Sequence, residues 1–147
     1  MIVDRDAKFA SQLRTMVANA GFDVTAHTDF SAARQQLLSA PPRFVVTNVR
    51  LGDFNGIHLV YIARRVSETF RALVYADRHD DVLAREAQRA GAFYERQQFI
   101  PVVLDRFLKA VLPSSDRRNA ALTERRTSFR GGRRATDTEA LQTMNVV

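Results

Sequence analysis

Polar and ionisable side chains follow several short apolar runs of the sequence, at places where the carboxyl ends of strands are expected. They are Asp4-Arg5-Asp6, Asn48, Tyr75, Tyr94 and Arg96-Gln97. Carboxylates grouped in this way can hold a divalent cation. A neutral amide such as Asn48, by contrast, has neither the charge nor the nucleophilicity for covalent catalysis. These residue types indicate binding and offer no evident nucleophile.

Cysteine is absent from the chain, which excludes disulfides, thiolate metal sites and a cysteine nucleophile. The three histidines, His27, His58 and His79, lie in separate segments. None has a carboxylate and a nucleophile at a spacing that indicates a catalytic or metal site. We therefore expect a protein that is not an enzyme.

The elements that must position these side chains alternate between short apolar runs and amphipathic helical patterns. Such alternation is typical of successive βα units around a parallel sheet, and five units can be counted. The predicted strands are Met1–Val3, Phe22–Ala26, Phe44–Thr47, Ala72–Ala76 and Ala92–Glu95. Phe44–Thr47 is continuously apolar on its N-terminal side, which favours a central strand buried on both faces.

Helix boundaries are indicated by glycine, proline and capping residues. Gly21 and Gly91 are predicted to end the first and fourth helices. Ser31 is predicted to cap the second helix, which Pro41-Pro42 must end. The third helix is expected over Ile57–Val66, after a loop from Arg50 to Gly56. The last helix is expected to begin near Pro101, because proline is tolerated in a first turn.

Composition divides the 147 residues into one domain and a tail. A chain of this size with 46% hydrophobic residues can form one ordinary core, which we assign to residues 1–113. Residues 114–147 are predicted to be a basic, disordered tail. The net charge is +6, and seven arginines lie between residues 117 and 134: Arg117, Arg118, Arg125, Arg126, Arg130, Arg133 and Arg134.

The N-terminal residues lack the apolar run of a signal peptide, and no stretch approaches the ~18 apolar residues of a membrane span. A cytoplasmic protein without membrane contact is therefore expected.

The stretch Val45–Gly56 resembles the third strand and following loop of the receiver domain of bacterial response regulators, the CheY-like family. Val3–Asp6 and Ala90–Tyr94 support the resemblance, which covers about residues 1–112. It implies a flavodoxin-like α/β fold, (βα)5, with a doubly wound parallel five-stranded sheet in three layers.

The resemblance also implies a chemistry. In this family an aspartate after the third strand accepts a phosphoryl group, while acidic residues after the first strand hold Mg²⁺. A hydroxyl after the fourth strand and a lysine after the fifth bind the phosphoryl oxygens, and an aromatic residue near the fifth strand reorients.

This sequence departs from that pattern at each position. The resemblance places Asn48 at the acceptor, Arg5 at the second acidic position and Tyr75 at the hydroxyl. Arg96 or Gln97 stands at the lysine, and Tyr94 matches the switch aromatic. A degenerate receiver, a pseudo-receiver without its acceptor aspartate, is therefore predicted.

The predicted metal site is also degenerate. Arg5 is expected to neutralise Asp4 and so fill the cation site, which makes Mg²⁺ binding unexpected. Asp4, helped by Asp6, is the weak candidate that remains. We expect no cofactor.

Three functions remain open. The first is a stand-alone, non-enzymatic signalling module of a two-component or phosphorelay pathway, which binds a histidine kinase or another regulator and can form a homodimer. The second is a receiver phosphorylated on another acidic residue, such as Asp53 or Asp6. The third is weak nucleic-acid binding by the arginines of the tail. Arg126–Arg130 also fits half of the motif by which PilZ domains hold a cyclic dinucleotide, although the tail lacks room for their β-barrel.

Overall fold

The computed structural model describes residues 1–111, and the predicted tail with its seven arginines lies outside them. Five parallel strands form one sheet in the order β2-β1-β3-β6-β7. Their bounds are Ile2–Val3 (β1), Ala26–His27 (β2), Phe44–Asn48 (β3), Arg71–Ala76 (β6) and Phe93–Arg96 (β7). The strand order reverses between β1 and β3, as in a doubly wound fold.

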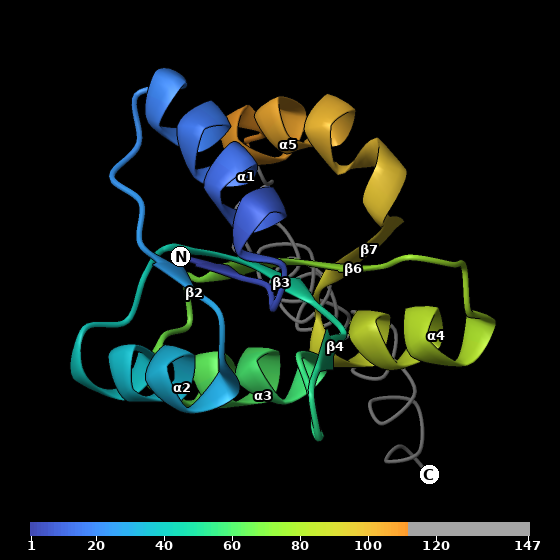
Figure 1. Cartoon of the computed structure of the whole chain (residues 1–147). Helices are drawn as coiled ribbons and strands as arrows, with labels where there is room; N and C mark the ends of the chain where they lie inside the picture. The colour runs from blue at the N-terminus through green and yellow to red at the C-terminus, as the bar shows by residue number, and fades with distance from the viewer. Residues whose placement is uncertain (112–147) are drawn as a thin grey trace, which may run out of the picture. The chain divides into compact units, whose positions relative to one another are not determined.

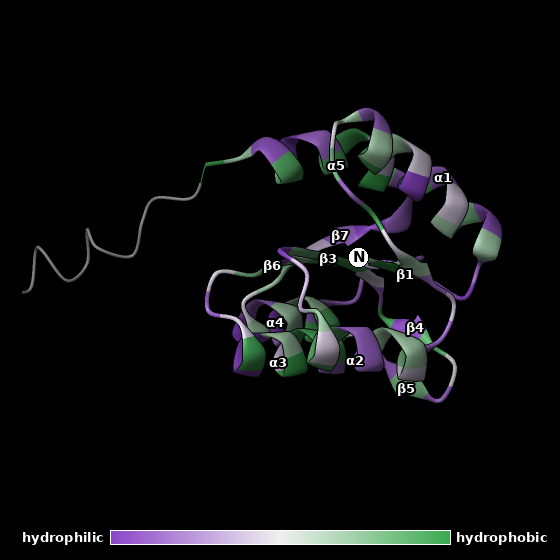
Figure 2. Cartoon of the chain, turned by 90° about the vertical axis from the view of Figure 1, so that its left-hand side faces the viewer, coloured by the Kyte–Doolittle hydropathy of each residue, from purple (hydrophilic) through white to green (hydrophobic). Residues whose placement is uncertain are grey.

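Five α-helices cover the two faces of the sheet, as Figures 1 and 2 show. Ala7–Asn19 (α1) and Ile100–Lys109 (α5) lie on one face, with the 3₁₀ turn Gln97–Phe99 (η1) leading into α5. Phe30–Ser39 (α2), Ile57–Val66 (α3) and Asp81–Ala90 (α4) lie on the other. The predicted flavodoxin-like three-layer fold is confirmed.

The central strands separate two apolar cores. Every residue of β6 is buried, as are the last four of β3, so both strands are covered on both faces as predicted. Val45 and Val74 point into the core under α2, α3 and α4. Val46 and Leu73 point into the core under α1 and α5. Both cores therefore hold the carboxyl ends of β3 and β6 in fixed positions.

Several helix boundaries agree with the sequence. α3 has the predicted bounds Ile57–Val66. Gly21 (φ 86°) and Gly91 (φ 79°) adopt the left-handed backbone that favours glycine, just after α1 and α4. The predicted cap of α2 was wrong. Asp29 caps this helix by accepting a hydrogen bond from the Ala32 amide at 2.8 Å, so α2 begins one residue before Ser31.

Two other predictions need correction. The second strand is not Phe22–Ala26 but the two residues of β2, because β1 offers only Ile2 and Val3 as partners. The expected loop from Arg50 to Gly56 contains a small antiparallel hairpin of Arg50–Leu51 (β4) and Phe54–Asn55 (β5), which turns at Gly52 (φ 74°). β1, β3 and β6 differ from prediction by one residue at one end, and β7 is shifted by one residue toward the C-terminus.

None of the helices in residues 1–111 has the length and apolar character that a membrane span needs.

Candidate functional site

The carboxyl ends of β1, β3 and β6 bring together Asp4, Asn48 and Tyr75. The Tyr75 hydroxyl donates a hydrogen bond to Asp4 Oδ2 at 2.6 Å, and Asn48 Nδ2 donates to the same oxygen at 3.3 Å. Asn48 and Tyr75 are register partners on adjacent strands, so their side chains leave the same face of the sheet. Three predicted site residues, far apart in the sequence, therefore form one cluster.

The carboxylate of Asp4 is buried and saturated with hydrogen bonds. Only 3% of the residue is exposed. Its other oxygen, Oδ1, accepts a bond from the Asp6 backbone amide at 2.8 Å. A buried carboxylate is tolerated when donors surround it, and here three donors replace the water it has lost.

Tyr75 fills the space beside this carboxylate. The residue is completely buried, and its ring packs edge-on against Phe9 of α1 with the ring centres 5.8 Å apart. Burial and the neighbouring Asp4 raise the pKa of the Tyr75 phenol far above its ordinary value. The hydroxyl is therefore protonated, and able to donate to Asp4, at neutral pH.

Asn48 is held from both ends of its amide. Its Oδ1 accepts a hydrogen bond from the Arg50 backbone amide at 2.9 Å, which leaves Nδ2 to face Asp4. The backbone carbonyl of Asn48 lies against Gly56, where any Cβ would collide with it. The glycine that follows the acceptor position is thus required by space rather than by backbone angle.

Arg5 does not take the place predicted for it. The expected ion pair with Asp4 was wrong: within residues 1–111 the ion pairs are His79–Asp81 and Asp105–Lys109. The Arg5 side chain is exposed, and its guanidinium lies beside Gly52 of the β4–β5 hairpin. Donors from β3 and β6 surround Asp4 instead, because they reach it from within the core.

The side chains of Asp6 and Asp53 are exposed, and neither carboxylate takes part in the hydrogen bonds around Asp4. Asp6 caps α1, since its Oδ1 accepts the amides of Lys8 and Phe9 at 2.9 and 3.2 Å. Asp53 lies in the turn of the hairpin.

These residues do not fit a Mg²⁺ ion. Asp4 directs both oxygens at hydrogen-bond donors, while Asp6 directs its own at the first turn of α1. Within the described part of the chain, no three histidine or acidic side chains gather as a cation would require. Mg²⁺ demands nearly octahedral oxygen ligation, which one saturated carboxylate does not offer.

The positions matched to the family's lysine also turn away from Asp4. The Arg96 guanidinium stacks on the ring of Phe99, 4.6 Å from its centre. Gln97 begins the 3₁₀ turn and lines a shallow hollow with Phe9, Asp77 and Pro101. Neither residue hydrogen-bonds to the Asp4 cluster.

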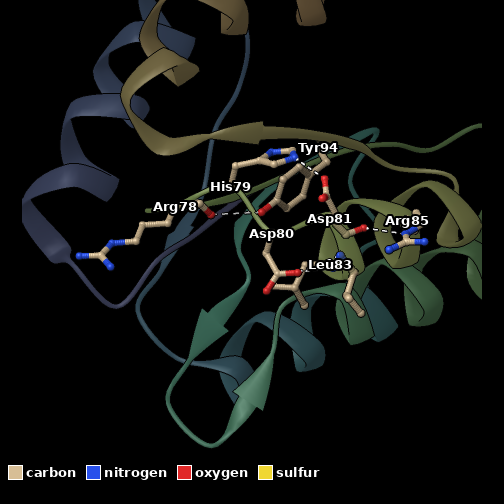
Figure 3. A network of polar contacts seen from close by, with 8 residues as sticks. Arg78, His79, Asp80, Asp81, Leu83, Arg85 and Tyr94 are labelled. Atoms are coloured by element: carbon tan, nitrogen blue, oxygen red, sulfur yellow. Dashed lines mark hydrogen bonds and ion pairs between the residues drawn. The ribbon is translucent and has the colours of Figure 1, made fainter.

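Tyr94, matched to the switch aromatic, belongs to a second polar network, shown in Figure 3. Its hydroxyl donates to the Arg78 carbonyl at 3.4 Å, and its ring packs edge-on against His79 at 5.7 Å. Burial raises the pKa of Tyr94 as well. His79 in turn contacts Asp81 at 2.9 Å. Tyr94 is therefore held toward the loop between β6 and α4, by a histidine to which the sequence assigned no role.

Comparison with known proteins agrees with this geometry. The family model described as "Response regulator receiver domain" matches residues 1–95. Among curated proteins, none matches the chain.

Solved structures with the same architecture share little sequence. A response regulator from Burkholderia pseudomallei with a phosphorylated aspartic acid, calcium ion and citrate has TM-score 0.68 and 17% identity, covering 89% of this chain and 73% of that one. A LuxR-family two-component response regulator from Aurantimonas sp. SI85-9A1 has TM-score 0.66 and 22% identity, covering 85% and 95%. A CheY-like receiver domain protein from Methanospirillum hungatei JF-1 has TM-score 0.65 and 15% identity, covering 86% and 94%.

Proposed function

Because the chain belongs to the response regulator receiver domain family, we propose that it is a pseudo-receiver: a two-component signalling module that takes no phosphoryl group on Asn48. It works by binding a protein partner, a histidine kinase or another regulator. It is not an enzyme, needs no Mg²⁺ and acts in the cytoplasm.

The observation that carries this proposal is the engagement of Asp4. Its Oδ2 accepts hydrogen bonds from Tyr75 and Asn48, at the place where a receiver would hold its metal between two carboxylates. Binding a cation there would require breaking a buried 2.6 Å hydrogen bond and moving a fully buried ring. An amide at position 48 supplies no nucleophile for the phosphoryl transfer itself.

The same contacts favour one fixed arrangement over two. In a switching receiver, the phosphoryl group must provide differential binding energy between two states. Here Tyr75 already fills the cluster, while Tyr94 is held by His79 and the Arg78 carbonyl. A partner would therefore meet the same surface at all times, and the abundance of the protein would set the signal.

Phosphate incorporation tests the proposal. The full chain is incubated with ³²P-labelled acetyl phosphate and Mg²⁺, beside a receiver domain known to accept phosphate, and alkali-labile label is counted. We expect label on the reference receiver alone. The variant Asn48→Asp is expected to remain unlabelled too, because Tyr75 still occupies Asp4 and Arg5 still replaces the second acid.

Alkali-labile label on the wild-type chain would overturn the proposal. Peptide mapping would then separate the alternatives, since Asp53 and Asp6 are exposed and Asp4 is buried. Label on Asp53 or Asp6 would support a receiver that uses another acidic residue.

A further inference from the structure

A groove runs between α5 and the edge strand β7, away from the Asp4 cluster. It has a volume of about 330 Å³, within the range of small-molecule sites. Leu73, Phe93, Val103 and Phe107 give it apolar walls. Arg71 and Arg106 add two guanidinium-bearing side chains to the lining. Because β7 is the last strand of the sheet, no further strand of residues 1–111 covers this side (Figure 1). We name it the α5–β7 groove.

Arg71 is a buried cation in this groove. Only 9% of the residue is exposed, and its guanidinium stacks on the rings of Phe107 and Phe44, 4.9 and 5.4 Å from their centres. Nη2 donates to the Phe107 carbonyl at 2.6 Å and Nη1 to the Ala110 carbonyl at 2.7 Å. These contacts explain why the side chain is held beneath the end of α5.

These contacts leave one hydrogen-bond donor of Arg71 without a partner. Nε of Arg71 is buried and makes no hydrogen bond within residues 1–111. The ion pairs within residues 1–111 involve other side chains, so no carboxylate offsets this charge. Burial and the like charge of Arg43 both lower the pKa of Arg71. A buried charge without a counter-ion is unfavourable, and an anion in the groove would relieve it.

The groove has a polarity along its length. Phe93, the first residue of β7, pairs with Leu73 of β6. Arg71 lies two residues before Leu73, at the end of the groove where α5 finishes. Glu95 lies at the opposite end, because it pairs with Tyr75. Arg71 and the last turn of α5, which carries Arg106, therefore lie near one end of the groove, and the single carboxylate of its lining lies toward the other.

From this arrangement we propose that the α5–β7 groove binds a small monocarboxylate with an apolar body. The carboxylate lies beside Arg71 and Arg106, whose guanidinium groups suit planar oxyanions. The apolar body lies between Phe93 and Val103. Glu95 repels a second negative charge at the far end, so dicarboxylates are excluded.

The proposal does not depend on the absence of phosphoryl transfer. A receiver that did accept phosphate on an aspartate could still bind a carboxylate at this groove, and a true pseudo-receiver could lack the groove activity. Phosphate labelling and ligand titration therefore fail separately.

Titration of the full chain with octanoate, followed by amide ¹H–¹⁵N NMR, tests the proposal. We expect saturable shifts at the amides of Leu73, Phe93 and Val103, with Kd below about 1 mM for a ligand of this size. The amides of Asn48 and Asp4 should not move. Octanamide, which has the same body without charge, is expected to bind at least about tenfold more weakly, and the dicarboxylate suberate likewise.

Three variants sharpen the test. Arg106→Gln is expected to weaken octanoate binding roughly tenfold, the effect of one charge-assisted hydrogen bond. Arg89→Gln is the matched control: it removes an exposed arginine from the last turn of α4, which is not part of the groove, and should leave binding unchanged. Val103→Glu, in the groove wall, should abolish binding while the rest of the spectrum shows a folded protein.

Three results would overturn the proposal. They are no saturable shift at the groove amides, equal affinity for octanoate and octanamide, and equal weakening by Arg106→Gln and Arg89→Gln. A peptide that binds in the groove would also contradict the proposal if amidation of its C-terminus did not weaken binding. The groove would then recognise the peptide chain and not a carboxylate.

Discussion

The two edges of the sheet each bury one charged side chain, and they satisfy it differently. At the carboxyl edge, Asp4 is 3% exposed and receives hydrogen bonds from Tyr75, Asn48 and the Asp6 amide. At the amino edge, Arg71 is 9% exposed. It donates to the carbonyls of Phe107 and Ala110, and its Nε has no acceptor in residues 1–111.

This difference separates a closed site from an open one. The donors to Asp4 come from β3, β6 and the Asp6 backbone, and together they engage both of its oxygens. The partners of Arg71 are neutral carbonyls and rings, so its charge is stabilised but not compensated. Of the two edges, the carboxyl edge, where this family carries out its chemistry, is thus the one less able to accept a ligand.

Among the substitutions that test this comparison, Arg71→Ala is expected to change the free energy of unfolding most. It removes two hydrogen bonds and the packing between Phe44 and Phe107, and we expect a loss of ~3–5 kcal/mol in the free energy of unfolding. Urea denaturation followed by circular dichroism measures it. Arg71→Met is the matched control, because it retains packing and removes the uncompensated charge. It should be less destabilising by ~2 kcal/mol or more, and equal losses would show that the charge itself stabilises the fold.

Asn48→Asp should destabilise the closed edge by ~2–3 kcal/mol at pH 7, because it replaces a donor to Asp4 with a second buried carboxylate. One of the two carboxyl groups would then have a folded-state pKa above its unfolded value. The folded state would bind the extra proton, so the loss should be small below about pH 4 and should grow as the pH rises. Denaturation at pH 4 and pH 7 measures it, and a loss independent of pH would contradict this account.

Tyr75→Phe removes only the hydroxyl that donates to Asp4, while the ring keeps its contact with Phe9. A loss of ~1–2 kcal/mol is expected in the same assay. In the wild-type protein the folded-state pKa of Tyr75 lies above the ordinary 10.0, so stability should fall as the pH rises past about 10. The variant should lack this share of the alkaline loss; an unchanged alkaline profile would mean that Tyr75 is not the group responsible.

Arg5→Gln has the smallest expected effect. The side chain is exposed and pairs with no carboxylate in residues 1–111, so stability should change by less than ~0.5 kcal/mol. A loss above 1 kcal/mol would restore the idea that Arg5 neutralises Asp4. The same denaturation assay applies, with Arg89→Gln as an exposed reference.

Much of the scaffold was predictable because its signals are local. Ile57–Val66 is a helix because apolar residues recur at helical spacing, and Gly91 ends α4 because glycine alone readily adopts the left-handed backbone there. Where prediction failed, a tertiary constraint decided. β2 is short because β1 offers only two residues for it to pair with. Arg50–Asn55 forms a hairpin that its sequence did not predict.

Which residues form the candidate site was predictable from the sequence, but which of them hydrogen-bond to one another was not. Asp4, Asn48 and Tyr75 each follow or end an apolar run, and parallel strands bring such positions to one edge. The resemblance placed Arg5 at the family's second acidic position, and from this we expected its guanidinium to neutralise Asp4. Adjacent residues of an extended chain point to opposite sides, and the actual partners come from other strands.

The sequence by itself determined the order of five βα units, most helix ends and the presence of an amide, Asn48, at the end of the third apolar run, because periodicity, turn chemistry and residue type are local properties. Only the tertiary structure decided that a phenol 71 residues away closes the Asp4 carboxylate, and that a guanidinium lies uncompensated beneath α5. Such contacts depend on strand order and register, which are fixed by the packing of the whole domain.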